Sequence, residues 1–324
     1  MIAIFGRASS GPFHDARPIH QGGEMLLRYS FFTIFLIAVC AGSPARAQNY
    51  ESYVSNSGND GNACTLTSPC ASFSTAHNAT GSGGSISCIS APASGQLTIT
   101  KSITIDCTGV AFNDVHGGVL VTINLPQSDA LQTVRLKGYT INGFGNGTRG
   151  VQINAAGTVI LEDMNIIQHT QQGVIDLRTS PGKLVITDTA ISGNAGAGVV
   201  VAGAAGTAAI LDNVTSAGNT FGIAVAAGNS VVVNRSVLSG NTTAGVEGDP
   251  GAQVVVNNST ISHNNVGVTS YQTVRLSNND IAFNTTAISG SGSGTFGNNR
   301  FSGNGSMGTA PAALGSASSD LGQQ

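Results

Sequence analysis

The hydrophobic residues of this chain recur at fixed offsets along most of its length. Runs such as KLVIT and SVVVN occupy one place in each repeat, and their last apolar residues form a first column. A second, mainly apolar column follows five positions later. Repeats of about 20–25 residues indicate a solenoid or a propeller. The first column comprises Leu136, Leu161, Ile186, Leu211, Val233, Val256, Leu276 and Phe296, and the second comprises Ile141, Ile166, Ile191, Ser216, Leu238, Ile261, Ile281 and Phe301.

The composition of each repeat selects one kind of solenoid. The runs are about five residues long and rich in Val and Ile, which favours strands, and Gly or Asn interrupts every stretch long enough for a helix. The repeat is also too short for a propeller blade, which needs about 40 residues. It therefore predicts one turn of a parallel β-helix, in which equivalent residues stack about 4.8 Å apart.

A polar column three positions after the second apolar column predicts a ladder at one corner of the coil. Asn tolerates the left-handed backbone of a tight corner, and its side chain hydrogen-bonds to an adjacent turn. We expect the His in this column to fill a corner rather than to catalyse a reaction. The predicted ladder comprises His169, Asn194, Asn219, Asn241, Asn264, Asn284 and Asn304.

The chain resembles the secreted bacterial right-handed parallel β-helix repeat proteins, which have a pectin-lyase-like fold. The resemblance rests on coils such as LVITDTAISGNAGAGV (Leu184–Val199) and on YVSNSGNDGNACTLTSPCASF (Tyr53–Phe73), and it covers nearly all of the chain after residue 47. It implies an all-β, single-stranded right-handed parallel β-helix whose open end is covered by a short N-terminal helix. An apolar face at Phe73, Ala76 and Ala79 or His77 places that helix at 73–79.

Segments outside the repeat complete the expected organisation. FFTIFLIAV, followed by the small-x-small sequence at 45–47, predicts a signal peptide at 25–47 that is too short to span a membrane. We therefore expect a secreted or periplasmic protein with no membrane span after leader removal. The other expected segments are a non-translated or additional extension at 1–24, an N-terminal cap at 48–95, coils at 96–304, and a flexible or capping tail at 305–324.

The cysteines agree with export. Four remain after the leader, namely Cys64, Cys70, Cys88 and Cys107, and an even number in an exported chain indicates disulfides. Three pairings are possible. We favour Cys64–Cys70, which closes a short loop, and Cys88–Cys107, whose separation along the sequence is close to the length of one coil.

Composition excludes one class of partner. Charged residues make up 9% of the chain, the formal net charge is −3, and no stretch is strongly basic. We therefore expect no nucleic-acid partner. A narrow solenoid core and many tight corners account for the absence of Trp and for the abundance of Gly. One domain is sufficient, because solenoids grow beyond the usual globular limit.

Catalysis on this fold would require acidic residues on successive coils. Clustered acids hold calcium in lyases, and two or three nearby carboxylates act in hydrolases. One cluster in the sequence could form a weak cation site or a catalytic pair, or it could be a corner ladder in which Asp and Asn are interchangeable. We favour the ladder, because Asn occupies the same column in later coils, and we assign no catalytic residue, metal site or cofactor. The cluster comprises Glu162, Asp163, Asp188 and Asp212.

An outward-facing row is the more unusual feature. One outward position of the main strand is aliphatic on five consecutive coils, with Arg at each end, and such a row would extend roughly 20 Å. We favour ordinary strand preference as the explanation of the row, and the alternative is a docking face for a partner, a second copy or the C-terminal tail. The candidate docking row comprises Ile160, Val185, Ile210, Val232 and Val255.

These patterns favour an exported, non-catalytic β-helix module that binds a polysaccharide or a protein partner. The alternative is a polysaccharide lyase or glycoside hydrolase of the pectin-lyase-like type. An enzyme should place three or more ionisable groups within about 8 Å of one another in a groove. The sequence leaves the oligomeric state open.

Overall fold

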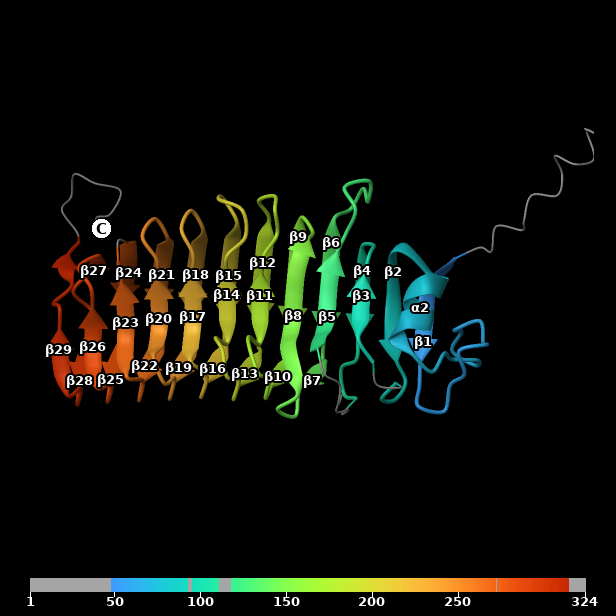
Figure 1. The fold of residues 1–324 in the computed structure, drawn as a ribbon, viewed down its shortest axis with the longest axis horizontal. Helices are drawn as coiled ribbons and strands as arrows, with labels where there is room; N and C mark the ends of the chain where they lie inside the picture. The colour runs from blue at the N-terminus through green and yellow to red at the C-terminus, as the bar shows by residue number, and fades with distance from the viewer. Residues whose placement is uncertain (1–47, 93–94, 111–117, 272, 315–324) are drawn as a thin grey trace, which may run out of the picture. The chain divides into compact units, whose positions relative to one another are not determined.

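The computed structural model describes residues 48–92, 95–110, 118–271 and 273–314. The leader expected at 25–47 and the extension expected at 1–24 lie outside these residues. The described chain forms three parallel β-sheets wound into a solenoid of about nine turns, with one short helix near its N-terminal end (Figure 1). The predicted parallel β-helix with a short N-terminal helix is therefore confirmed.

Sheet A contains the runs that define the repeat. It has twelve strands, and those from β6 to β24 alternate inward and outward residues, as in β18, where Val231 and Val233 are buried and Val232 points outward. The strands, in spatial order, are β1 (Asn49–Val54), β2 (Thr80–Cys88), β4 (Ile103–Asp106), β6 (Thr133–Lys137), β9 (Thr158–Glu162), β12 (Lys183–Thr187), β15 (Ala208–Asp212), β18 (Ser230–Asn234), β21 (Gln253–Asn257), β24 (Thr273–Ser277), β27 (Ser293–Thr295) and β30 (Ala312–Ala313).

Sheet B contains eight strands of three residues, and the middle residue of each points into the coil. Ser216 is the polar member of this inward column, and its hydroxyl donates to the Gly222 carbonyl oxygen at 2.8 Å. The strands are β7 (Thr140–Asn142), β10 (Asn165–Ile167), β13 (Ala190–Ser192), β16 (Thr215–Ala217), β19 (Val237–Ser239), β22 (Thr260–Ser262), β25 (Asp280–Ala282) and β28 (Arg300–Ser302).

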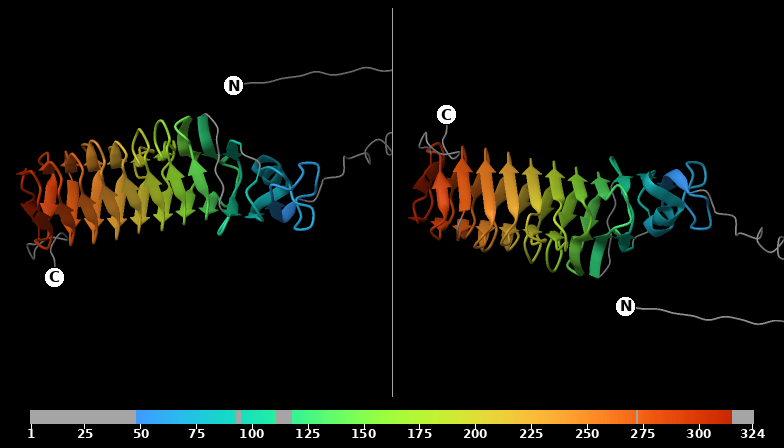
Figure 2. Two further views of the ribbon diagram at one scale, coloured as in Figure 1. Left: turned by 90° about the horizontal axis from the view of Figure 1, so that it is seen from below. Right: turned by 90° about the horizontal axis from the view of Figure 1, so that it is seen from above.

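Sheet C closes each coil, and stacking of the three sheets along the solenoid is visible in Figure 2. Glycines at or just before the start of several of its strands pass close to the next coil; a side chain at Gly222, the second residue of β17, would clash with the backbone at Gly245. Its ten strands are β3 (Leu97–Ile99), β5 (Gly118–Asn124), β8 (Gly147–Ala155), β11 (Val174–Asp176), β14 (Val199–Val201), β17 (Phe221–Val225), β20 (Ala244–Gly248), β23 (Val266–Ser270), β26 (Thr286–Ser289) and β29 (Ser306–Gly308).

The predicted register holds from Leu136 to Leu276, where each residue of the first column pairs with the next. The last step is different, because Leu276 pairs with Thr295 and not with Phe296. Ile281 still pairs with Phe301, so this coil has one more residue between its sheet A and sheet B strands. The alignment of Phe296 was therefore wrong by one residue.

Helix α2 (Phe73–Ala79) spans the residues that the sequence predicts. Ser72 caps it by accepting a hydrogen bond from the Thr75 amide at 3.2 Å. Its buried face includes Phe73, whose ring meets that of Tyr139 edge to face at 5.3 Å. His77 Nε2 accepts from the Thr100 amide at 3.2 Å, just after β3. The helix thus covers the end of the coil that carries β3.

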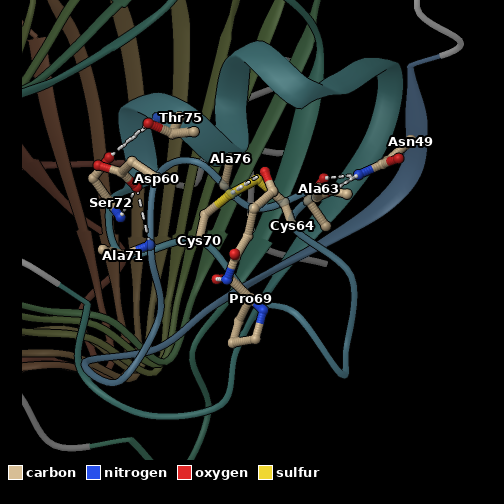
Figure 3. Close-up of a disulfide and its surroundings, with 12 residues drawn as sticks. Asn49, Asp60, Ala63, Cys64, Pro69, Cys70, Ala71, Ser72, Thr75 and Ala76 are labelled. Carbon is tan, nitrogen blue, oxygen red and sulfur yellow. Dashed lines mark hydrogen bonds between the residues drawn. A yellow bond between two sulfur atoms is a disulfide. The ribbon is translucent and has the colours of Figure 1, made fainter.

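Both expected disulfides are present. Cys64–Cys70 closes a loop of the cap, and next to it Asp60 Oδ1 accepts hydrogen bonds from the Ala71 and Ser72 amides, both at 2.9 Å (Figure 3). Cys88, at the end of β2, bridges to Cys107, directly after β4, with 4.7 Å between the Cα atoms. This second bridge joins two adjacent coils, because β2 and β4 are neighbours in sheet A.

Strand pairing extends past both limits expected for the coils. At the N-terminal end, β1 and β2 already belong to sheet A, although they lie within the expected cap at 48–95. At the other end, β29 and β30 follow residue 304 and pair with β26 and β27. Their sequence is small and polar, with weak strand preference, so pairing with the preceding coil determines their structure.

Candidate functional site

The five members of the candidate docking row lie side by side on the outer surface of sheet A. Ile160 pairs with Val185, Val185 with Ile210, Ile210 with Val232, and Val232 with Val255. Ile210 is 49% exposed and Val232 is 38% exposed, while the other three are half-buried by their neighbours. The alternation of β-strands therefore places a continuous aliphatic row on the surface.

Basic residues end the row. Arg135 pairs with Ile160 in the sheet, and its guanidinium forms an ion pair with Glu162, with 3.0 Å between Nε and Oε2. Arg275 pairs with Val255, and its Nη1 donates to Gln253 Oε1 at 3.1 Å. Within the described ranges Arg275 makes no ion pair. The surface is thus apolar along its middle. At its ends, Glu162 neutralises the charge of Arg135, whereas Arg275 is available to pair with an anion.

The four candidate acids do not converge on one point. Thr187 separates Glu162 from Asp212 in the sheet, and these two acids are bound to different Arg side chains. Arg235 holds Asp212, with 2.9 Å between Nε and Oδ1, and this hydrogen bond is the main cause that lowers the pKa of Asp212. The described residues contain no group of three His, Cys, Asp or Glu side chains that could hold a metal ion.

Asp163 and Asp188 have the backbone expected of corner residues. Their φ angles are 53° and 51°, and Asn258 at the same place in a later coil has a φ of 50°. Asn213 donates from Nδ2 to Asp188 Oδ1 at 2.7 Å. Asp163 also lines an open pocket of about 400 Å³ with Val110, Thr140 and Met164 among its walls. The backbone conformation and the exchange of Asp for Asn support a structural role for this column.

The ladder column is a row of buried amides. Asn241 is typical: its backbone N–H and its Nδ2 both donate to Asn264 Oδ1 at 2.9 Å, and Nδ2 also donates to the Ser216 carbonyl oxygen at 3.2 Å. His169 begins the row, with 2.8 Å between Nδ1 and Asn194 Oδ1. Its Nε2 has no partner among the described residues, and burial lowers the pKa of the imidazole. The backbone N–H groups of Asn194, Asn219, Asn264 and Asn284 likewise donate to the Oδ1 of the next member.

The structure contains a buried ion pair that the sequence analysis did not predict. Asp176 and Arg178 are fully buried, with 2.8 Å from Arg178 Nε to Asp176 Oδ1 and 2.7 Å from Nη2 to Oδ2. Nη1 donates to the carbonyl oxygens of Ala156 and Gly157, and Nη2 donates weakly to that of Lys183. The contact between Nη2 and Oδ2 is an ion pair without hydrogen-bond geometry, and Asp176 Oδ2 has no hydrogen-bond donor among the described residues.

The pocket beside this pair has a volume of about 340 Å³. Loop residues such as Gln127, Gln132 and Thr179 line it together with Arg178. Because Arg178 is hydrogen-bonded to Asp176 and to the carbonyl oxygens of Ala156, Gly157 and Lys183, the guanidinium binds three segments of the solenoid together. No periodic signal could have revealed the pair, since an acid occurs once in this inward column, between Ile153 and Val201.

The described part of the chain contains no helix long and apolar enough to cross a membrane. No curated protein sequence matches the chain significantly. Among solved structures, a pectate lyase, Pel9A, is 14% identical with a TM-score of 0.46 and covers 86% of this chain and 80% of its own. The A-module of the Azotobacter vinelandii mannuronan C-5 epimerase AlgE4 is 14% identical, with a TM-score of 0.49 and coverage of 72% and 91%.

The corresponding module of AlgE6 from the same organism is 16% identical, with a TM-score of 0.47, and covers 74% of this chain and 91% of its own. The activities of these three proteins do not transfer to this chain at such identities. A family model described as the right-handed beta helix region matches residues 122–285, about half of the sequence. The three parallel sheets and this match together place the chain in the right-handed β-helix family.

Proposed function

We propose that the protein is an exported, non-catalytic module that binds a protein partner along the candidate docking row of sheet A. The observation that carries the proposal is the in-register row of five outward-facing aliphatic residues on consecutive coils, of which Ile210 and Val232 are exposed and the other three are half-buried. Two disulfides support an oxidising, extracytoplasmic compartment. The pairing of Glu162 and Asp212 with Arg supports binding rather than acid–base chemistry.

The chemistry of the row favours a protein over a polysaccharide. Its side chains are all aliphatic, so they offer dispersion contact to another apolar surface but no ring face to a sugar. Arg275 at its end is available to a carboxylate. The partner that fits is a protein with an apolar ridge that ends in an acidic residue. A second copy running in the opposite direction fits less well, because Arg135 would face Arg275.

A photo-crosslinking amino acid at position 210, introduced in the cells that produce the protein, tests the proposal. We expect a discrete crosslinked protein species that disappears when Val185 and Val232 are both changed to Thr. The matched control is position 237, because Val237 is 39% exposed but lies on sheet B. The same species at both positions, or none at position 210, would exclude the row as the binding surface.

Two further measurements cover the other functions. Light scattering of the purified protein shows whether the crosslinked species is a second copy. A lyase and hydrolase assay on uronate polysaccharides tests the alternative of an enzyme. Turnover that survives the Val185→Thr/Val232→Thr change would replace the proposal with that alternative.

A further inference from the structure

A pair of exposed aromatic rings lies at the corner between sheets B and C, away from the docking row. The rings of His263 and Phe283 belong to adjacent coils and are stacked, with 5.4 Å between centroids and 29° between planes. Phe283 is 59% exposed, and His263 is also exposed. Only 5% of the chain is Phe, Trp or Tyr, so two stacked rings on the surface are uncommon here.

Both rings occupy positions where the fold favours glycine. The same place in other coils is Gly193, Gly218, Gly240 and Gly303, with φ between 64° and 66°, and Gln168, with a φ of 60°. His263 and Phe283 have φ angles of 55° and 57°, a region that is unfavourable for a bulky residue. The backbone bonds are the same with either residue type: Gly240 N donates to the Ser262 carbonyl oxygen and Phe283 N to that of Ser302.

A single stacked pair recovers less free energy than two left-handed side chains cost. The stability of the corner therefore does not explain the two aromatic side chains, since Gly adopts the same backbone conformation without this cost. Strained residues that remain exposed are a feature of binding sites.

The surroundings define the ligand chemistry. The Phe283 ring lies over Gly303, where an added Cβ would come within 2.5 Å of it, so that end of the stack is covered. On the His263 side, Gly240, Gly218 and Gly193 leave three coils of bare backbone with only ordinary contacts to a Cβ. We call the backbone of these three glycines the shelf, and it ends at the His263 ring. Small hydroxyl-bearing residues lie beside it, namely Ser192, Ser239 and Thr242.

We propose that this shelf and the rings of His263 and Phe283 bind a neutral glycan. A sugar has an apolar C–H face that stacks on an aromatic ring and hydroxyl groups that bond to Ser and Thr. A small apolar molecule needs an enclosed pocket, and this surface is open. The residues directly before and after the ring positions, from Ser192 to Asn304, carry no charge, and the Asp280–Arg300 ion pair three residues before Phe283 and Gly303 is neutral as a unit, which favours a neutral sugar over a uronate.

Affinity electrophoresis of the full mature chain tests the proposal, with xylan, galactomannan or mixed-linkage glucan in the gel. We expect at least one neutral polysaccharide to retard the protein. The dissociation constant should rise at least tenfold in the His263→Gly/Phe283→Gly variant and change little in Phe283→Tyr. The matched control is Phe144→Gly, because Phe144 is also an exposed ring at positive φ but has no stacked partner in the described chain.

Thermal melting distinguishes a binding role from a structural one. The His263→Gly/Phe283→Gly variant should melt at or above the temperature of the native protein, because it relieves two left-handed side chains. A lower melting temperature, retardation by polygalacturonate alone, or no retardation by any neutral polysaccharide would overturn the proposal. The Ile210→Thr variant should still bind the glycan, because Ile210 lies on sheet A, away from the two rings. A negative result for the docking row can therefore be told apart from a negative result for the glycan site.

Discussion

At the scale of single residues, the direction in which each side chain points decides its energetic role. Val232 and Val233 are neighbours in β18, yet one is 38% exposed and the other is fully buried. The same chemical change at the two positions therefore has different consequences. Thr has nearly the shape of Val, so the comparison isolates the effect of a hydroxyl.

We expect Val233→Thr to lower the free energy of unfolding by roughly 1–3 kcal/mol, because it buries a hydroxyl in the aliphatic core. Val232→Thr should cost less than about 1 kcal/mol, since the hydroxyl reaches water and no cavity forms. Denaturant unfolding of both variants measures the difference. Equal losses would mean that the inward and outward columns are not as described, and Ile210→Thr should behave like Val232→Thr.

His169 gives a prediction that depends on pH. Burial lowers its pKa, so between the folded and unfolded values the unfolded state binds more protons, and stability falls as the pH drops below about 6.5. His169→Asn should reduce the loss of melting temperature between about pH 7.5 and about pH 5, because Asn continues the amide row without titrating.

His77 provides the comparison for this measurement. Burial, with the Lys101 charge as a second cause, lowers its pKa to about 4, so its contribution to the pH dependence of stability has the same sign as that of His169. His77→Gln should therefore reduce the loss over the interval from about pH 6.5 down to about pH 4. An unchanged pH dependence in His169→Asn would show that the imidazole is not buried in the neutral form.

At the scale of strands and coils, the Asp176–Arg178 pair is the main departure from repetition. It lies where neighbouring coils of sheet C have Ile153 and Val201, and a side chain at Gly182 would clash with Arg178 Nη1. Asp176→Ala should lower the free energy of unfolding by about 3–5 kcal/mol, because it leaves the guanidinium buried without its anion.

A double-mutant cycle tests this pair directly. The Asp176→Val/Arg178→Met variant should lose less stability than the sum of its two single variants, by about 1–3 kcal/mol. Urea unfolding of the four proteins gives the coupling free energy. Additive losses would show that Arg178 acts only through the carbonyl oxygens of Ala156, Gly157 and Lys183.

Sequence reasoning succeeded where a residue type repeats and was incomplete where it does not. The offsets of five and three positions were enough to predict sheet A, sheet B and the amide row, because stacking converts a period into a column. A second buried row was missed: Ser236 N donates to Ser259 Oγ at 3.1 Å, and Ser259 N to Asn279 Oδ1 at 2.9 Å. Its signal is weaker, since Met164 and Val214 occupy the same column.

The remaining differences arise from contacts without a local pattern. Pairing with a preceding coil forms β29 and β30 in a sequence that does not favour strands. An extra residue after Thr295 shifts the alignment of Phe296. The acids of the candidate cluster were predicted as a corner column, but their separation by Arg135 and Arg235 required the side-chain positions.

At the scale of the whole molecule, the N-terminal coils are held by covalent links as well as by packing. Removing the Cys88–Cys107 bridge by changing both residues to Ser should lower the free energy of unfolding by roughly 2–4 kcal/mol, because the bridge closes a loop about one coil long. The Cys64–Cys70 bridge closes a shorter loop, so its removal should cost less. Thermal melts of the two variants measure this order.

Peptide mapping of the non-reduced protein provides the accompanying test. A peptide pair joined through Cys88 and Cys107 is expected in protein recovered from the periplasm or the medium. Free thiols at both positions in that material would contradict the bridge. Cross-links between Cys70 and Cys88 would instead indicate a different arrangement of the cap.

The unshifted register of β12 and β15 gives the solenoid a natural unit of length. Ile186 and Leu211 are partners one full coil apart, so deleting the segment 187–211 would join Ile186 to Asp212 and restore every sheet with one coil fewer. Inserting a copy at the same junction would do the reverse and extend the molecule by about 4.8 Å. Duplication or deletion of the gene segment that encodes one coil would thus change the length of the solenoid without altering its cross-section or either of its ends.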